Sequence, residues 1–288
     1  MVTKLSIPKY NSIEVINAVL TERKKFLAFY ELISNDLRDQ INLYIKEKGD
    51  PTNIIALNLK NYTKSNEEAE KRKTTLINLF SPKKEQPLYT ILEEMRINHG
   101  LLFCPSCGED GAPGTLDHYL PKTEFPELSI CIANLTPMCS TCQNQKSSKY
   151  LTPYGKKAFF HPYFDEIMFS LFHVNILPPY SKPSDFNLII KESIPSNIKV
   201  LVESHIKGIQ LKKRFEKYCE SKYLHLLKLV ADERKEKEPL KAHRLIRIFL
   251  LQEEQKSLNA WGAIFYQSVL NTPTLLNYLD NGTLPKFI

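Results

Sequence analysis

The sequence contains no long run of apolar residues, although hydrophobic residues make up 42% of its 288 positions. A transmembrane helix needs about 20 consecutive and mostly apolar residues, so we expect no membrane-bound segment. The first 14 residues, MVTKLSIPKYNSIE, also lack the apolar core of a secretory signal. We therefore expect a cytoplasmic protein, and the charged content of 25% is ordinary for a soluble globular chain.

Glycine and cysteine are scarce, with 9 and 6 residues respectively. The sequence has no glycine-rich phosphate loop, so we expect no ATPase site of its own, and any ATP-driven step would belong to a partner. The chain is too long, and its cysteines too few, for a disulfide scaffold. Cys131 and Cys219 match no metal-binding pair and are expected to be small buried residues.

The positive charge is concentrated in one block of the sequence. Between Lys207 and Arg247 there are 13 Lys and Arg residues against 6 Asp and Glu residues, and this surplus equals the net charge of +7 for the whole chain. A basic block of this kind suits a polyanion such as nucleic acid. A charge run is more commonly the solvated face of a helical pair, so the charge alone does not decide between the two.

Four of the six cysteines form two Cys-x-x-Cys pairs. Cys104 and Cys107 lie on a turn that holds Pro105 and Gly108, and the second pair is formed by Cys139 and Cys142. A single pair could be a redox centre, but two such pairs beside turn residues indicate a tetrahedral zinc site. Four thiolates leave no open position for water, so we expect a structural zinc that contributes folding energy and no catalysis.

The segment between the two cysteine pairs holds the candidate chemistry. Two short strands, over residues 115–119 and 135–138, and a helix over residues 142–150 would form a compact ββα unit. Asp117 and His118 are adjacent, so on an extended strand they would face opposite ways, and a local bend could bring both to one site. A carboxylate is a natural Mg²⁺ ligand, and a neutral imidazole is a natural base for activating water. Together they are typical of metal-assisted phosphodiester hydrolysis.

Three motifs in this region resemble the zinc-containing HNH endonuclease family. They are the first Cys-x-x-Cys, then LDHYLPK, then ANLTPMCSTC followed by a lysine after three further residues. The resemblance covers about residues 100–150 directly. The next segment, FHPYFD, resembles a segment of HNH nucleases from bacterial anti-phage defence systems of the Septu-like kind, in which the nuclease is paired with an ATPase subunit.

The resemblance implies a role for each motif residue. His118 matches the general base, Asp117 the neighbouring metal ligand, and Asn134 the central asparagine that fixes the loop and orients the histidine. The family's third position follows the last cysteine and is normally His or Asn. Here Gln143 occupies it and Asn144 comes next, about 100° further around the helix. One of these two would complete a site for catalytic Mg²⁺ or Mn²⁺.

Three further residues are accessory candidates. His161 could reach metal or phosphate, although a place in a cluster with its aromatic neighbours in the sequence is the more common outcome for such a residue. Lys122 and Lys146 can contact phosphates. Solvated lysines, however, are more common than phosphate-binding ones.

We therefore predict a mainly helical α+β protein built around a zinc-stapled ββα-metal (HNH) nuclease core. Its three regions would be a helical N-terminal region (1–98), the nuclease core (99–165) and a mixed, then helical, C-terminal region with basic helices (166–288). Apolar periodicity predicts helices over residues 11–48, 66–80, 88–98, 240–265 and 273–279, with helical structure returning from residue 208. Strand composition predicts strands over residues 168–177, 186–190 and 198–202.

The predicted function is a metal-dependent endonuclease that hydrolyses phosphodiester bonds in nucleic acid, with DNA favoured, as the nuclease effector of an anti-phage system. Three alternatives remain open at this point. The substrate could be RNA of the tRNA type, the chain could be a zinc-based nucleic-acid-binding module whose catalytic site has decayed, or the zinc could only shape a docking surface for a partner.

Overall fold

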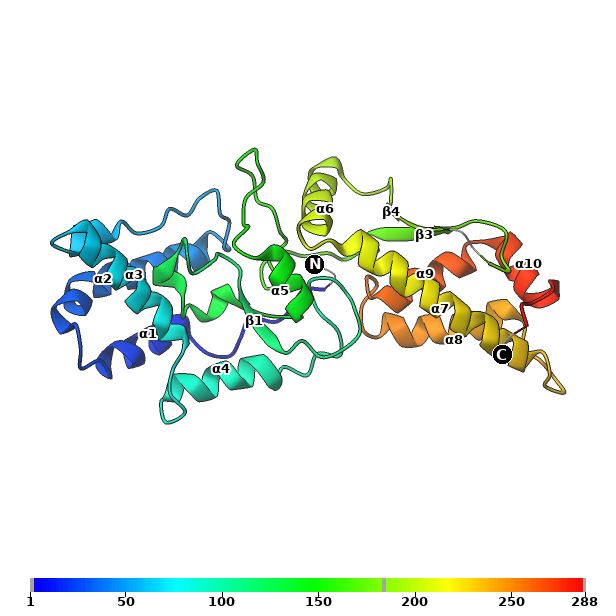
Figure 1. Ribbon diagram of the computed structural model, residues 1–288, viewed down its shortest axis with the longest axis horizontal. Helices are drawn as coiled ribbons and strands as arrows, with labels where there is room; N and C mark the ends of the chain where they lie inside the picture. Colours follow the sequence, from blue (N-terminus) through cyan, green and yellow to red (C-terminus); the bar gives the residue numbers. More distant parts are fainter. Residues whose placement is uncertain (1–2, 183–184, 287–288) are drawn as a thin grey trace. The chain divides into compact units, whose positions relative to one another are not determined.

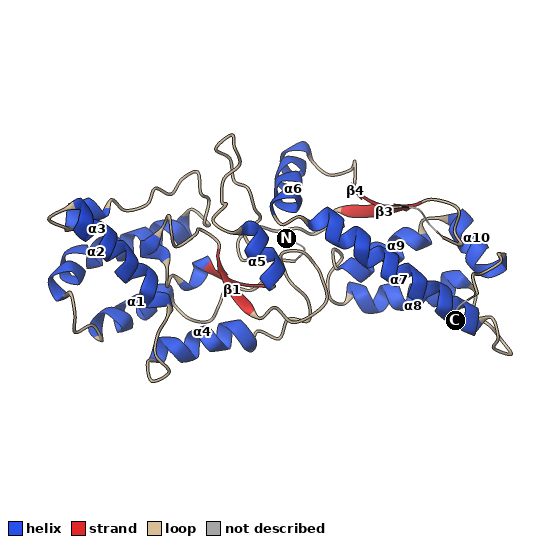
Figure 2. Ribbon diagram, in the orientation of Figure 1, coloured by secondary structure: helices blue, strands red, loops and turns tan. Residues whose placement is uncertain are grey.

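The computed structural model describes residues 3–182 and 185–286, and it is mainly helical with two small antiparallel sheets (Figures 1 and 2). The predicted mainly helical character is thus confirmed. The chain divides into two compact units. Unit 1 comprises Thr3–Ser106 and Gly111–Glu166, and unit 2 comprises Cys107–Asp110 and the chain from Ile167 onward. In the described part of the chain, no helix has the length and apolarity needed to cross a membrane.

Unit 1 begins with four α-helices that surround the predicted nuclease segment. They are α1 (Ser12–Thr21), α2 (Leu27–Lys46), α3 (Asn66–Ile77) and α4 (Pro87–Ile97), with the short 3-10 helices η1 (Leu59–Tyr62) and η2 (Asn78–Phe80). The apolar stripe of α2 is fully buried at Ile33, Leu37 and Ile41, which recur at the four-residue spacing of one helix face. The predictions for residues 66–80 and 88–98 therefore correspond to α3 with η2 and to α4.

The prediction of one helix over residues 11–48 is wrong. The helix ends at Thr21 and a second one starts at Leu27. The residue before the restart, Phe26, has a φ of 61°, which places it in the left-handed region and breaks the helical path. Apolar periodicity continues across this break, so the periodicity alone could not reveal it.

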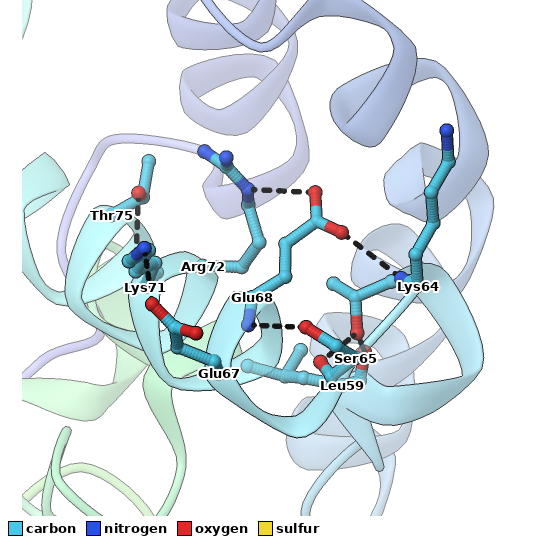
Figure 3. A network of polar contacts seen from close by, with 9 residues as sticks. Leu59, Lys64, Ser65, Glu67, Glu68, Lys71, Arg72 and Thr75 are labelled. Carbon is cyan, nitrogen blue, oxygen red and sulfur yellow. Dashed lines mark hydrogen bonds and ion pairs between the residues drawn. The ribbon is translucent and has the colours of Figure 1, made fainter.

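The N-terminus of α3 is fixed by the polar contacts drawn in Figure 3. The backbone N–H of Glu68 donates to Ser65 Oγ at 3.1 Å, and Glu68 Oε2 accepts from the backbone N–H of Lys64 at 3.0 Å. These contacts satisfy N–H groups that the helix itself leaves unpaired. Glu67 and Glu68 in the first turn also lie at the positive end of the helix, where negative charge is stabilising.

The middle of unit 1 is a β-hairpin followed by a short helix. Strands β1 (Thr115–His118) and β2 (Leu135–Met138) pair antiparallel, with Asp117 opposite Thr136 and His118 opposite Leu135. The 3-10 helices η3 (Pro126–Leu128) and η4 (Ile132–Asn134) lie in the connection, and α5 (Ser140–Lys146) packs on β1. The predicted strand, return and helix are all present. The helix over residues 142–150 is displaced, because Cys139 caps it early and Ser147, with a φ of 51°, ends it.

Unit 2 combines five helices with a second two-stranded sheet, within the part of it that the structure describes. The helices are α6 (Ser196–Gly208), α7 (Leu211–Glu233), α8 (Ala242–Glu254), α9 (Trp261–Leu270) and α10 (Pro273–Asn281), and the strands are β3 (Phe172–Ile176) and β4 (Phe186–Ile190). Helix α9 packs on β3 and α7 packs on β4. The 186–190 strand and the 273–279 helix are confirmed, while the 168–177 strand is shorter than predicted. Cys219, on α7, is fully buried as expected.

Two predictions in unit 2 are wrong. Residues 198–202 are helical, because the buried Val202 and His205 lie three positions apart on one face of α6, and helical structure therefore returns at Ser196. The predicted helix over residues 240–265 is two helices. Asn259 lies in the turn between them, where its side chain accepts from the N–H of Leu171 and donates to the carbonyl of Phe169.

Unit 2 also holds the short turn Cys107–Asp110. The backbone N–H and the indole N–H of Trp261 donate to the carbonyls of Gly108 and Cys107, at 3.0 and 2.6 Å. Lys256 forms an ion pair with Asp110 at 2.8 Å, and Arg214 with Glu109. The single tryptophan of the chain is thus buried against the turn that follows the first cysteine pair.

The cap of α3 can be tested by Ser65→Ala. The substitution removes the acceptor for the Glu68 N–H, so we expect the free energy of unfolding to fall by about 1 kcal/mol in urea denaturation. Ser221→Ala, on the exposed face of α7, is the matched control and should change it by less than about 0.5 kcal/mol. Equal effects of the two substitutions would show that the contact does not stabilise α3.

Candidate functional site

Four cysteine thiols converge in a cluster that could hold a metal ion such as zinc. The Sγ atoms of Cys104, Cys107, Cys139 and Cys142 all lie within 4.8 Å of one another. A tetrahedral zinc with Zn–S bonds of about 2.3 Å places its sulfurs about 3.8 Å apart. The observed set therefore fits such an ion after a small contraction.

Hydrogen bonds to sulfur support the same cluster. The backbone N–H groups of Cys139 and Cys142 point at Cys104 Sγ and Cys139 Sγ, each at 3.4 Å. The Arg214 guanidinium lies 3.7 Å from Cys107 Sγ. Donors and positive charge beside a thiol favour the thiolate, which is the form that binds metal.

The His118 imidazole is buried, and its orientation is set by one carbonyl. Its Nε2 lies 2.8 Å from the carbonyl oxygen of Ser129, which can only accept, so Nε2 carries the proton. In the neutral ring, Nδ1 then holds the lone pair. Burial lowers the pKa of His118 to about 3, so the ring is neutral at physiological pH.

The Asp117 carboxylate is buried beside an ammonium group. Lys146 Nζ lies 2.9 Å from Asp117 Oδ2, and the same ammonium donates to the backbone carbonyl of His118 at 2.8 Å. Burial raises the pKa of the Asp117 carboxyl, and the Lys146 charge acts in the opposite direction. Oδ2 is therefore paired with the Lys146 ammonium, which already supplies a positive charge at this oxygen.

Asn134 is fully buried and closes the loop that connects the two strands. Its Oδ1 accepts from the N–H of Leu120 at 2.7 Å, and its Nδ2 donates to the carbonyls of Leu120 and Leu128 at 3.0 and 3.3 Å. The Tyr119 N–H donates to the Asn134 carbonyl at 2.8 Å. This pattern is consistent with the loop-fixing role that the motif implies for Asn134.

The two candidates for the third motif position differ in exposure. Gln143 is partly buried, and its Nε2 donates to the Leu116 carbonyl at 2.8 Å, so its side chain points toward β1. Asn144 is exposed on α5. That one of these two side chains would join Asp117 as a metal ligand stays a prediction.

The lysine candidates have different environments. Lys146 is only 1% exposed, so the expectation of a solvated side chain is wrong. Cys142 and Lys146 are four residues apart and therefore share the inner face of α5, a signal that was present in the sequence. Lys122 is half-buried, with its ammonium 4.7 Å from the centre of the Phe80 ring, and burial lowers its pKa.

His161 is fully buried in an aromatic cluster. Its ring centre lies 4.2 Å from that of Tyr119 and 4.4 Å from that of Phe164. Its Nδ1 accepts from the Tyr163 N–H, and its Nε2 lies 2.8 Å from the Tyr44 hydroxyl. Both ring nitrogens are therefore engaged inside the protein, which is the structural outcome that the sequence favoured.

Two residues near His118 were not singled out from the sequence. The Phe80 ring packs edge-on against the His118 ring, with centres 4.4 Å apart. Ser129 supplies the carbonyl for His118, and its hydroxyl donates to the Leu76 carbonyl at 2.6 Å. The end of α3 and η2 thus form one wall around the imidazole. No local motif marks Phe80, because this contact depends on tertiary packing.

Comparison with known proteins gives one partial match. The chain is 31% identical over 86 residues to "Protein ea31" of Escherichia phage lambda, and the alignment covers 30% of this chain and 29% of that protein. The match therefore spans less than a third of the relative's length. No family model matches the chain, and no solved structure gives a significant match.

The cysteine cluster predicts a tightly bound metal ion. We expect the purified protein to contain about one equivalent of zinc by elemental analysis, and Cys142→Ser to lose most of it, with a lower thermal midpoint. Ser140→Ala, two positions away on the same helix, is the control and should keep the ion. A full zinc content in Cys142→Ser would contradict a four-thiolate site.

Proposed function

We propose that this chain is a metal-dependent endonuclease of the HNH kind, which hydrolyses phosphodiester bonds in nucleic acid. The observation that carries the proposal is the state of His118. Its imidazole is held by the Ser129 carbonyl as a neutral ring with the lone pair on Nδ1, one residue from a buried carboxylate. A positioned neutral imidazole with a free lone pair can accept a proton from the attacking water.

The surrounding residues support this role by fixing the imidazole. Phe80 restricts the ring from one side, and the Ser129 carbonyl fixes the tautomer. Asn134 joins the segments on both sides of the connection, so the hairpin that carries His118 cannot open without breaking three hydrogen bonds. Such preorganisation lowers the reorganisation needed when the reaction occurs.

A divalent cation, Mg²⁺ or Mn²⁺, would bind at Asp117, with Gln143 or Asn144 as the second protein ligand. The Asp117 carboxylate offers the oxygen ligands that a hard cation prefers, although its Oδ2 now contacts the Lys146 ammonium. When bound, such an ion stabilises the charge that develops on phosphate and on the leaving oxygen. The four-cysteine cluster would hold zinc as a structural ion, separate from this chemistry.

The proposed substrate and partners rest on the basic block and on the FHPYFD segment. The basic block between Lys207 and Arg247 would contribute phosphate contacts in unit 2, and DNA is the favoured polymer over RNA. A role as the effector of an anti-phage system, together with a separate ATPase subunit, rests on the resemblance of the FHPYFD segment alone.

A second candidate is a nucleic-acid-binding module whose catalytic site has decayed. The observation that favours it is the engagement of Gln143, whose amide N–H is bonded to the Leu116 carbonyl, together with the exposure of Asn144. Salt-sensitive binding of nucleic acid without any metal-dependent cleavage would support this candidate over the nuclease.

Cleavage assays test the nuclease proposal. Zinc-loaded protein supplied with excess Mg²⁺ or Mn²⁺ should cut duplex DNA, single-stranded DNA or RNA. His118→Ala should lower the rate by about 10²- to 10⁴-fold, because the general base is lost. His225→Ala, at an exposed position of α7, should retain the full rate. Equal rates for the two variants would contradict the proposal. The absence of cleavage by the wild type, both alone and with an ATPase partner, would also contradict it.

A further inference from the structure

The cation position at Asp117 is already in use by the chain itself. The Lys146 and Asp117 side chains are only 2% and 6% exposed, and the contact between Nζ and Oδ2 is 2.9 Å. A buried carboxylate and a buried ammonium are each costly in isolation, so the pair persists because each compensates the other. The oxygen that is best placed to accept a metal is therefore the oxygen that Lys146 contacts.

The second contact of Lys146 shows why the ammonium stays at this place. The ammonium donates to the His118 carbonyl at 2.8 Å. It therefore contacts both the Asp117 side chain and the His118 backbone. The same ammonium lies 5.8 Å from the centre of the Phe159 ring, and the residue is only 1% exposed. At this buried position, two cations near one carboxylate oxygen would repel each other strongly, because solvent screening is weak.

We propose that Lys146 is the resident counter-ion of Asp117, and that a divalent ion binds at Asp117 only by taking over the contact that Lys146 now makes. The pairing of the two residues rests on the geometry alone, whereas the part that concerns the divalent ion rests on the proposed function. Lys146 is then a positioning residue, since it acts through Asp117 and the His118 backbone without touching substrate.

The proposal makes metal affinity depend on the charge at position 146. Lys146→Met keeps the length and apolar character of the side chain but removes the charge that competes with the ion. Lys146→Gln removes the charge but retains an N–H that can donate to the His118 carbonyl, so it offers a second neutral variant in case Lys146→Met does not fold. Lys146→Arg keeps the positive charge and should show no gain in metal affinity.

Mn²⁺ titration of the zinc-loaded full-length chain, with free Mn²⁺ followed by electron paramagnetic resonance, measures this affinity without any cleavage assay. We expect Lys146→Met and Lys146→Gln to bind Mn²⁺ at least about tenfold more tightly than the wild type, because a like charge has been removed. Asp117→Asn should remove this binding. Lys149→Met, at an exposed lysine three residues further on, should change the affinity by less than about twofold.

Unchanged or weaker Mn²⁺ binding in both neutral variants would overturn the proposal, as would Mn²⁺ binding that survives Asp117→Asn in the Lys146→Met background. A purely structural lysine would lower the thermal midpoint on substitution and leave the Mn²⁺ affinity as it was. The two proposals can fail separately, because tighter binding in the variants is measurable even if no polymer is cut, and cleavage by the wild type can occur even if the affinities are equal.

Discussion

The hydrogen bonds of the Asn134 side chain are the constraint on which the rest of the candidate site depends. They tie the segment just after β1 to the end of η3, across a connection that would otherwise be free to open. Because Asn134 is fully buried, no water competes for these bonds, and a lost partner would leave a costly unsatisfied group. The positions of His118 and of Ser129, whose carbonyl meets the imidazole, follow from this closure.

Three buried ionisable groups of unit 1 each have a specific partner. Asp117 has Lys146, and the His118 ring has the Ser129 carbonyl. Glu127, in the same connection, accepts from the N–H of Leu57 and from Gln40 through Oε1, and burial raises its pKa to about 7. A low-dielectric environment strengthens each of these pairings and penalises every unpaired charge. The same environment would give an incoming cation a strong interaction with Asp117, at the expense of the Lys146 contact.

Most residues of the candidate site could be predicted from the sequence, but fewer of the residues that pack around them could. The cysteine spacing predicted a cluster that the structure assembles, and the positions of β1, β2 and the following helix were recognisable from short local patterns. The regular alternation of a strand also anticipated that Asp117 and His118 would have different neighbours, and they do: Lys146 for the carboxylate, and Phe80 with Ser129 for the ring.

Tertiary contacts account for what the sequence did not reveal. The break before α2 depends on the left-handed conformation of Phe26, whose ring lies 3.7 Å from the Arg72 guanidinium, and neither feature has a local signature. Periodicity could not separate strand from helix over residues 198–202, because a short apolar run fits both. Local sequence does not predict the burial of Lys146, because lysine is rarely buried without a partner, and the partner, Asp117, is 29 positions earlier in the chain.

The account depends most directly on the protonation state of the His118 imidazole, which nitrogen-15 NMR of histidine-labelled protein measures. The Ser129 contact and the pKa of about 3 require a neutral ring with its proton on Nε2 and a bare Nδ1 from pH 8 down to pH 5. The ordinary histidine pKa of about 6.5 would instead give a mostly charged ring at pH 5. A ring that carries its proton on Nδ1 would contradict the proposed base, because the lone pair would then lie on the nitrogen that faces the Ser129 carbonyl, whereas a ring charged at pH 5 would contradict only the effect of burial on its pKa.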